Sequence, residues 1–400
     1  MKEDKTVPQL RFPEFTDAWK QRKFGDSFDF LQNNTLSRAS LNDTSGCAKN
    51  VHYGDILVKF GESISAEKAD LPFICEREIL KKLSKSILKN GDVVIADTAE
   101  DMTTGKSCEI VDVDKCMPVL AGLHTIPVRP KQKFGKYYLG YYLNSEAFHS
   151  QLIPLIQGIK VYSISKSSIK DTVVMFPDDV QEQEKIGSLF NRIDNTITLQ
   201  QRKLNSLQKL KKGLLQKMFP KNGENIPEIR FPEFSDAWKQ RELNEIADTI
   251  DTGKSIFSKS NIGKFKILGS TGVIGFDEDY DYEGSFLLTA RVGANAGNLY
   301  RSSGKVKITD NTVFIKSKFI DYLFYSLEKF NLKRLSFGTG QPLIKSSELK
   351  KLNISVPCDE NEITKIEHFF ITIDRTITLQ QRKLESLQKL KKGLLQQMFI

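Results

Sequence analysis

Residues that could hold a phosphate group occur at two places in this sequence. The tripeptide Gly-Lys-Ser stands at 105–107 and again at 253–255, and it matches the end of a phosphate-binding P-loop. A P-loop also needs a second glycine further upstream, but Glu100 and Asp248 occupy the required positions. The sequence therefore predicts no ATP hydrolysis.

No other arrangement of reactive side chains predicts catalysis. The histidines stand in unlike contexts without the spacing of metal ligands, and the acidic run at 277–283 favours a solvated loop over a cation site. The chain also lacks a Gly-x-Gly-x-x-Gly motif and the Asn/Asp-Pro-Pro-aromatic motif of amino-methyltransferases. We therefore expect a binding protein without catalytic residues, metal or cofactor.

The composition indicates a packed, basic protein. Of its 400 residues, 39% are hydrophobic, and a chain of this length suits about two to four domains. We expect a cytoplasmic location without membrane contact, because no apolar run has the length of a membrane span and the cysteines show no CxxC spacing. The net charge of +9 favours a polyanionic partner.

Two segments of the chain are each present twice. TITLQQRKLNSLQKLKKGLLQKMF at 196–219 returns as TITLQQRKLESLQKLKKGLLQQMF at 376–399, and RFPEFTDAWKQR at 11–22 returns as RFPEFSDAWKQR at 230–241. The chain therefore consists of two half-units, each with an RFPEF segment, a variable centre and a long helix. Similar frames around unlike centres indicate that the frames do one job twice, whereas the centres do two different jobs.

Both copies of the lysine-rich stretch belong to a long predicted helix. Asp179 with Glu182, and Asp359 with Glu362, are placed to form capping boxes at the helix starts. Apolar residues then recur at heptad spacing, and about 40 residues at ~1.5 Å each give a rod of roughly 60 Å. The seam consists of Ile186, Phe190, Ile193, Ile197, Leu204, Leu207, Leu214 and Met218 in the first copy, and of Ile366, Phe370, Ile373, Ile377, Leu384, Leu387, Leu394 and Met398 in the second.

A helix with such a seam must bury it against another apolar surface. We expect the two copies to pair antiparallel about an internal two-fold axis. The contact is expected from Ile197, Leu204, Leu207, Ile377, Leu384 and Leu387. Alternatively, each helix packs only on its own globular centre. The seam is interrupted at Gln200 and Lys211 and at their copies Gln380 and Lys391, and the glutamines would either fix the register or face solvent.

The centres, 23–178 and 242–357, have the pattern of mixed α and β structure. Predicted strands are 54–59, 91–95 and 305–308, and predicted helices are 137–143 and 322–330. A shared lead-in precedes each long helix: Gly158, Ile164, Ile169, Lys170 and Pro177 match Gly338, Ile344, Leu349, Lys350 and Pro357. The loops in these lead-ins, IQGIKVY and SFGTGQP, differ between the halves, and divergent loops on a shared scaffold are typical of recognition.

Together these repeats resemble the specificity (S) subunit of type I restriction–modification systems. The resemblance covers essentially the whole chain and rests on the doubled FPEF…W segments, the Gly…Ile…Pro lead-ins and the doubled helix. ARVGANAGNLYR at 290–301 is also similar to a common segment of target-recognition domains. The first centre departs from the pattern, because IQGIKVY lacks the GTGQP text.

The resemblance implies an α+β fold with two target-recognition domains of mixed α/β content. Two long antiparallel helices with internal pseudo-two-fold symmetry join them. The expected segments are 1–178 (first recognition domain), 179–220 (first long helix), 221–229 (linker), 230–358 (second recognition domain) and 359–400 (second long helix).

The resemblance also implies a DNA-reading subunit without catalytic activity. Each recognition domain would read one half of a split, asymmetric site in double-stranded DNA. The helices would set the gap and dock two methyltransferase (M) subunits, which carry S-adenosylmethionine and methylate adenine. Two restriction (R) subunits would add ATP-driven translocation and cleavage in the full complex.

Individual DNA contacts are expected from side chains suited to base edges and phosphates, since Arg reads guanine and Asn or Gln reads adenine. The first centre offers Lys59, Arg77, Lys106, Lys160 and Tyr162, and the second offers Lys254, Arg291, Asn295, Arg301, Lys333, Arg334 and Gln341. An alternative hypothesis is an assembly scaffold whose centres bind proteins. A steep fall of affinity with salt would indicate phosphate contacts, whereas a shallow fall would indicate a protein interface.

Overall fold

The computed structural model describes residues 6–114, 116–221, 223–257, 260–335 and 343–400. The chain divides into two compact units: unit 1 comprises Met1–Gln200 with Lys383–Ile400, and unit 2 comprises Gln201–Arg382. Each unit contains one variable centre, its RFPEF segment and a part of each long helix. The predicted α+β fold class with two long helices is confirmed.

The elements of the first half, in chain order, begin with strands and short helices and end with a long helix. The strands are β1 (Lys20–Lys23), β2 (Phe28–Phe30), β3 (Ala48–Val51), β4 (Ser63–Ser65), β5 (Phe73–Ile74), β6 (Val93–Ala96), β7 (Thr98–Ala99), β8 (Ser107–Val111), β9 (Val119–Ala121), β10 (Thr125–Pro130), β11 (Tyr162–Ser163) and β12 (Val173–Phe176). The helices are α1 (Phe24–Ser27), α2 (Tyr53–Val58), α3 (Arg77–Lys82), α4 (Tyr138–Asn144), α5 (Glu146–His149), α6 (Lys166–Lys170) and α7 (Val180–Lys217), with 3-10 turns η1 (Arg38–Ser40), η2 (Ser84–Ser86) and η3 (Ile153–Leu155).

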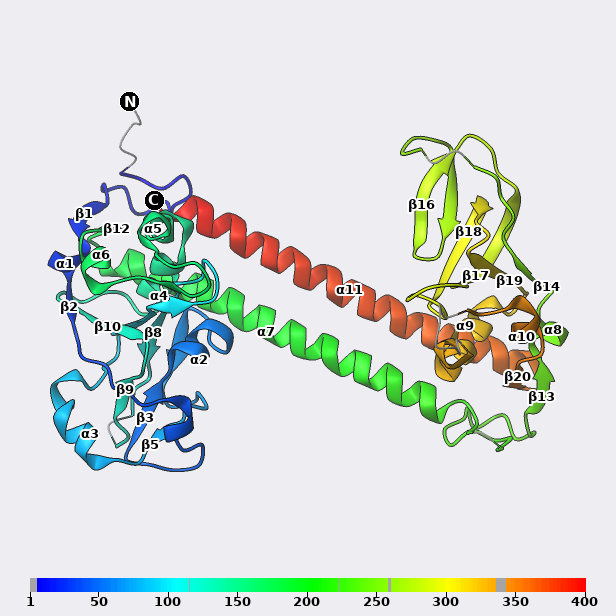
Figure 1. Ribbon diagram of the computed structural model, residues 1–400, viewed down its shortest axis with the longest axis horizontal. Helices are drawn as coiled ribbons and strands as arrows, with labels where there is room; N and C mark the ends of the chain where they lie inside the picture. Colours follow the sequence, from blue (N-terminus) through cyan, green and yellow to red (C-terminus); the bar gives the residue numbers. More distant parts are fainter. Residues whose placement is uncertain (1–5, 115, 222, 258–259, 336–342) are drawn as a thin grey trace. The chain divides into compact units, whose positions relative to one another are not determined.

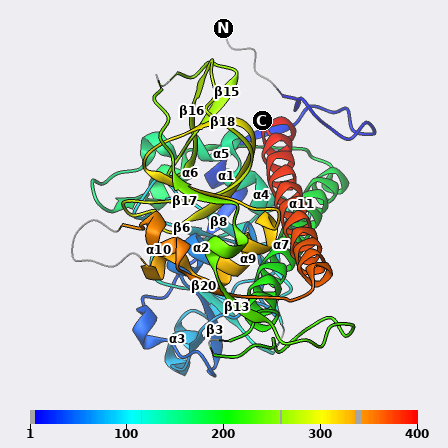
Figure 2. The same cartoon turned by 90° about the vertical axis from the view of Figure 1, so that its right-hand side faces the viewer.

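The second half has longer strands and again ends in a long helix. The strands are β13 (Lys239–Glu242), β14 (Thr249–Thr252), β15 (Phe265–Gly269), β16 (Gly272–Asp277), β17 (Tyr282–Ala290), β18 (Leu299–Ile308), β19 (Thr312–Lys316) and β20 (Asn353–Val356). The helices are α8 (Leu243–Ile246), α9 (Ile320–Phe330), α10 (Ser346–Lys350) and α11 (Glu360–Met398), with the 3-10 turn η4 (Leu332–Leu335). Figure 2 shows β15, β16 and β18 extending away from the α9 end of unit 2.

The main sheets of the two units share one topology. Unit 1 has the strand order β2-β10-β6-β8-β4, and unit 2 has the order β14-β19-β17-β18-β15-β16. In both sheets the fifth strand of the order pairs parallel with the fourth, β4 with β8 and β15 with β18, whereas the preceding pairs are antiparallel. The centres are therefore copies of one fold, although their sequences show little in common.

The two long helices run antiparallel within each unit. In unit 1, the carboxylate of Asp194, in the first half of α7, lies 2.7 Å from Nζ of Lys391, near the end of α11. In unit 2 the relation is reversed, because Lys211, near the end of α7, lies 2.9 Å from Asp374, in the first half of α11. The beginning of one helix thus lies beside the end of the other in both units (Figure 1).

The start of each long helix is held by the RFPEF segment rather than by a capping box. Asp179 does cap α7, since its carboxylate accepts a 2.7 Å hydrogen bond from the backbone N–H of Gln181. Glu182, however, does not reach back to the cap; it is 1% exposed and receives two 2.7 Å hydrogen bonds from Arg11. Unit 2 repeats this contact between Arg230 and Glu362. The capping-box prediction is therefore wrong in its second half, because a buried carboxylate is stabilised more by a bidentate guanidinium than by an exposed backbone N–H.

An aromatic residue at the end of each long helix closes the core of one unit. Phe399 lies within 6.4 Å, between ring centroids, of rings that include Trp19 and Phe190, all in unit 1. Phe219, at the equivalent place after α7, lies within 6.1 Å of Trp238 and Phe370 in unit 2. The core of unit 1 therefore includes a phenylalanine from the end of α11, and the core of unit 2 includes one from the end of α7.

The predicted short elements are confirmed with one exception. Strand β6 overlaps the predicted strand at 91–95, β18 covers 305–308, α4 overlaps the predicted helix at 137–143, and α9 covers the one at 322–330. The predicted strand at 54–59 is wrong, because α2 occupies it. The imidazole Nδ1 of His52 accepts a 3.2 Å hydrogen bond from the N–H of Gly54 and so caps this short helix. The sequence did not indicate this cap, because the usual capping residues are Ser, Thr, Asp and Asn.

Candidate nucleic-acid interface

Two of the predicted contacts in unit 1 lie together at one edge. Tyr162 belongs to β11, which pairs with β7, and its backbone carbonyl accepts a 3.3 Å hydrogen bond from the hydroxyl of Thr104. Lys160 precedes it in an exposed turn at Gly158. The segment 158–162 and the loop at 100–106 therefore lie side by side. Within the described residues, the ammonium group of exposed Lys160 has no hydrogen-bond or ion-pair partner.

The other predicted residues of unit 1 lie apart from this surface or are engaged. Lys106 donates hydrogen bonds of 3.1 and 2.9 Å to the carbonyls of Leu57 and Phe60, so its ammonium group holds α2 in place. Lys59 is exposed and pairs with Asp70 at 3.1 Å, and Arg77 is exposed at the start of α3.

In unit 2 the structure brings four of the predicted residues into one neighbourhood. Arg291 and Asn295 lie in the loop between β17 and β18, and Lys333 and Arg334 lie in η4. Loop and turn touch at Gly297, where an added Cβ would lie 2.6 Å from the backbone nitrogen of Lys333. This loop and η4 together form the basic surface of unit 2.

Two further predicted residues of unit 2, Arg301 and Lys254, do not join that surface. The guanidinium of Arg301 pairs with Asp321 and Asp374 and lies 4.2 Å from the ring centre of Phe324, so it anchors β18 to the helices. Burial alone would lower the pKa of Arg301, but nearby Tyr325 and Asp321 raise it. Lys254 is exposed and pairs with Asp251 at 3.1 Å. Gln341 lies outside the described residues.

A feature that the sequence did not reveal is a backbone junction in unit 1, which we call the first corner. The N–H of Gly105 donates to the carbonyl of Ala96 at 2.8 Å, the N–H of Asp97 donates to the carbonyl of His124 at 3.1 Å, and the N–H of Ile164 donates to the carbonyl of Asp97 at 2.9 Å. These bonds join the end of β6, the start of β10 and the lead-in to the long helix.

The same junction recurs in unit 2 as the second corner. The N–H of Gly297 donates to the carbonyl of Ala290 at 3.0 Å, the N–H of Arg291 donates to the carbonyl of Asn311 at 2.9 Å, and the N–H of Ile344 donates to the carbonyl of Arg291 at 2.8 Å. Each bond matches its counterpart in unit 1 in partners and length. Only the pair Ile164 and Ile344 was visible in the sequence, through the shared lead-in.

Both corners require a glycine. Gly105 and Gly297 have φ angles of +91° and +85°, which side-chain-bearing residues rarely adopt. An added Cβ at Gly105 would also lie 2.7 Å from Cδ1 of Leu152. The glycine of the first Gly-Lys-Ser tripeptide therefore serves this backbone turn.

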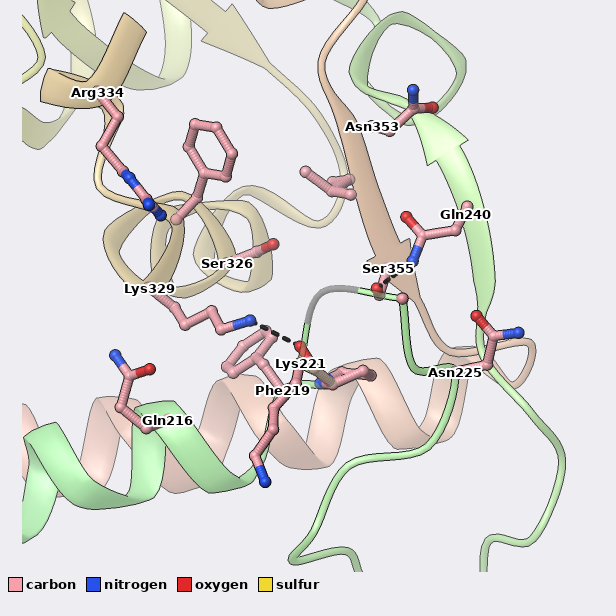
Figure 3. Close-up of a pocket in the computed structure, with 14 residues that line it drawn as sticks. Gln216, Phe219, Lys221, Asn225, Gln240, Ser326, Lys329, Arg334, Asn353 and Ser355 are labelled. Atoms are coloured by element: carbon pink, nitrogen blue, oxygen red, sulfur yellow. Dashed lines mark hydrogen bonds between the residues drawn. The ribbon is translucent and has the colours of Figure 1, made fainter.

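Unit 2 also contains a cavity of about 800 Å³ beside the end of α7 (Figure 3). Figure 3 shows Lys329 and Arg334 on the side of α9 and η4, and Gln240 and Asn353 on the strand side. Lys329 donates a 2.6 Å hydrogen bond to the carbonyl of Pro220, and burial lowers the pKa of its ammonium group. Since its lining contains basic and amide side chains but no acidic one, the cavity continues the basic surface at Arg334.

The predicted seam of the long helices is buried to different degrees. Leu204 and Leu384 are each 3% exposed, whereas Ile197, Leu207, Ile377 and Leu387 are half-buried. Because Asp194 lies opposite Lys391 in unit 1, Ile197 is about level with Leu387 there, and Leu207 is correspondingly level with Ile377 in unit 2. Contacts among the six side chains stay a prediction.

Two charged clusters, which we call helix locks, set the register of the long helices. In the first lock, Lys391 pairs with Asp194, which also accepts a 2.6 Å hydrogen bond from the hydroxyl of Tyr141. Burial would lower the pKa of Lys391, but Glu62 and Asp194 raise it.

The second lock repeats the arrangement in unit 2. Lys211 pairs with Asp374, which accepts a 2.8 Å hydrogen bond from Tyr325. In the described parts of the chain, Oε1 of Gln200 and of Gln380 is buried without a hydrogen-bond partner, and a role of these glutamines in the register stays a prediction. Of the lysine–aspartate pairs that join the two helices, the sequence showed only the lysines, as interruptions of the seam.

Among the described residues, no group of three or more His, Cys, Asp or Glu side chains is arranged to hold a metal ion. Within the same residues, no helix has the length and apolar character that crossing a membrane requires.

The fold defines a class of protein with two copies of one mixed helix–strand unit, each combined with parts of two long antiparallel helices. The chain belongs to the family described as "Type I restriction modification DNA specificity domain", whose sequence model matches residues 16–209 and 235–389. The resemblance noted in the sequence is thereby confirmed.

Several individual proteins are similar to this chain. The type I restriction enzyme MjaVIII specificity subunit of Methanocaldococcus jannaschii is 27% identical over 276 residues, which span 60% of this chain and 64% of the relative. The chain thus covers slightly less than two thirds of that relative's length. The putative MjaX specificity subunit of the same organism is 23% identical over 420 residues, 96% of this chain and 93% of the relative.

Solved structures show the same fold at low identity. The S subunit of a type I restriction–modification system from M. genitalium superimposes with a TM-score of 0.66 at 13% identity, covering 98% of this chain and 99% of that one. A structure described as the basis of complex assembly and conformational transition of the type I R-M system gives a TM-score of 0.53 at 15% identity, covering 94% and 96%.

Proposed function

We propose that this chain is the DNA sequence-recognition subunit of a type I restriction–modification complex. Its two recognition domains, 1–178 and 230–358, read the two unlike halves of a split site in double-stranded DNA. The observation that carries the proposal is the pair of corners, because the same backbone junction presents unlike side chains in the two units. A duplicated reader with two different faces suits a site with two different halves.

The proposed DNA contacts follow the two surfaces described above. In unit 1 they are Lys160 and Tyr162, and in unit 2 they are Arg291, Asn295, Lys333 and Arg334. Lys59, Arg77 and Lys254 are proposed as phosphate contacts, because exposed ion pairs such as those of Lys59 and Lys254 contribute little and exchange readily for a phosphate. Lys106 and Arg301 act by positioning, since their charges are held inside the protein.

A segment exchange tests whether each recognition domain reads one half of the site. Replacing 242–357 by the second centre of another family member, in a chain expressed with its M subunit, is expected to change one half-site and to leave the other unchanged. Mapping methylated positions across the genome measures this. A change in both half-sites, or in neither, would remove the modular proposal and favour the alternative, a scaffold whose centres bind proteins.

The outer faces of the long helices are the proposed docking surfaces for two M subunits, and through them for two R subunits. Leu199 and Leu379 are each 63% exposed, and Leu210 and Leu390 are 52% and 51% exposed. Residues eleven positions apart lie on one face of a helix, so each helix presents the same pair of exposed leucines. Two equal apolar faces on one chain suit two equal partners. The chain itself is proposed to supply no catalysis and no cofactor.

A charge placed on these faces should remove M subunits one at a time. We expect Leu199→Glu to weaken one of two M sites by about tenfold or more, and the double change with Leu379→Glu to weaken both, because a glutamate would be buried against the partner. Native mass spectrometry of the complex counts bound subunits. Asn205→Glu is the matched control, since it introduces the residue that stands at 385 in the second copy. Full occupancy in the double variant would contradict this docking surface.

A further inference from the structure

Asp97 in the first corner and Arg291 in the second have equivalent backbone positions but unlike side chains. Asp97 and Arg291 each donate their N–H to the residue before a buried threonine, and each accepts from the isoleucine of the lead-in. The backbone N–H and the backbone carbonyl of each residue are therefore both hydrogen-bonded. Each residue directly follows a strand, and these hydrogen bonds fix its backbone, as a base-reading group requires.

In the first corner, the carboxylate of Asp97 is oriented by polar neighbours. Its Oδ1 accepts a 2.7 Å hydrogen bond from the hydroxyl of Thr98 and lies 3.4 Å from Nδ1 of His124. The His124 ring meets the Tyr53 ring edge to face at 5.3 Å. The side chain of Asp97 is 27% exposed, so one face of an acceptor group remains open to solvent.

In the second corner, the guanidinium of Arg291 is half-buried and forms no hydrogen bond or ion pair with any residue that the structure describes. The following Val292 forms a β-bridge with Leu343, just as Thr98 pairs with Ser163 in unit 1. Arg301 in β18, in contrast, has two carboxylate partners, Asp321 in α9 and Asp374 in α11. Within the described residues, Arg291 is thus a cation on a fixed backbone position without a partner for its charge.

We propose that Asp97 and Arg291 are equivalent base-reading positions of the two half-sites. This inference rests on the proposed function and names the side chains that carry its specificity. Arg291 donates both of its terminal N–H groups to O6 and N7 of a guanine, and Asp97 accepts a hydrogen bond from the amino group of a cytosine. The two half-sites therefore differ at the base that faces this position.

Reciprocal substitutions in the full chain, expressed with its M subunit, test the assignment by mapping methylated sites in genomic DNA. Arg291→Gln is expected to shift one position of the second half-site from guanine towards adenine, with discrimination changed by roughly fivefold or more. The first half-site should not change. Asp97→Asn should alter one position of the first half-site only, and since asparagine keeps an oxygen for Thr98, the local fold is retained.

Two further variants control for charge and for folding. Lys264→Gln removes a positive charge at the far end of the same sheet, about eight residues or roughly 26 Å along β17, because Lys266 pairs with Val306 and Val306 pairs with Tyr282. This variant should keep the wild-type site. If Arg291→Gln lowers the melting temperature by several degrees, Arg291→Ala replaces it, and the guanine preference should then be lost without a new one.

The outcomes separate the two levels of the proposal. A wild-type complex that methylates no split site would contradict the proposed function itself. A wild-type complex that does so, with Arg291→Gln or Arg291→Ala retaining the same guanine, would show that Arg291 is not a base reader. An unchanged first half-site in the Asp97→Asn variant would likewise show that Asp97 is not a base reader.

Discussion

A chain with Phe399→Ala is expected to lose about 3–5 kcal/mol from the free energy of unfolding of unit 1, while unit 2 unfolds as before. Phe399 is 4% exposed and closes a cluster of aromatic rings that includes Trp19 and Phe190. Alanine would leave a cavity among rigid rings, which relax little. Phe219→Ala should instead destabilise unit 2 and leave the unfolding of unit 1 unchanged, because Phe219 closes the core of unit 2.

The two tryptophans allow each unit to be followed separately. Trp19 is buried in unit 1 and Trp238 in unit 2, and the sequence has no third tryptophan. Urea titration monitored by the fluorescence of one tryptophan, with phenylalanine in place of the other, resolves the two transitions. Leu390→Ala is the control, because Leu390 is 51% exposed and should cost less than about 0.5 kcal/mol. Equal destabilisation of both units by Phe399→Ala would contradict this assignment of the cores.

Lengthening both long helices together is expected to change the site that the complex reads, at full activity. The stretch from Asp194 to Lys211 equals that from Asp374 to Lys391, so the two helix locks require equal helix lengths between them. Seven residues inserted after Arg202 and seven after Arg382 add about 10 Å to each helix, or roughly three base pairs of spacer. Methylation mapping should show the same half-sites with a longer gap.

The single insertion is the informative control. If seven residues are inserted in α7 alone, α11 keeps its original length, and the two helix locks can no longer form at the same time. We expect this chain to lose either a lock or the ability to form an active complex, with methylation reduced at least tenfold. An unchanged gap in the double insertion, with activity retained, would show that the helices are not the ruler.

The long helices and the duplicated plan could be predicted from the sequence because they are local or repeated. Heptad spacing predicts a helix without knowledge of its surroundings, and identical text predicts identical structure. The capping boxes were only half correct, because Glu182 bonds to Arg11, far away in the chain. Sequence patterns near the helix start carry no information about that partner.

The candidate interface was harder to predict, and the reason is geometric. Asp97, His124 and Ile164 meet in space, and their counterparts in unit 2 stand at different offsets along the chain. No single offset between the two halves therefore brings all three pairs together. Charge alone selected Arg291 and Arg301 equally, although among the described residues only Arg301 is paired with carboxylates. Only tertiary contacts distinguish them.

The discontinuous core of unit 1 also has a consequence for the order of folding during synthesis. Unit 2 is a continuous stretch, Gln201–Arg382, whereas unit 1 needs Lys383–Ile400 in addition to Met1–Gln200. A ribosome makes the chain from its N-terminus, so the half that is translated first must wait for residues made after the whole of unit 2. Until Phe399 arrives, Trp19 and Phe190 lack this one packing partner. The earlier half of the message thus encodes the unit that is completed last, and a ribosome stalled within unit 2 would leave unit 1 as the natural target for chaperones.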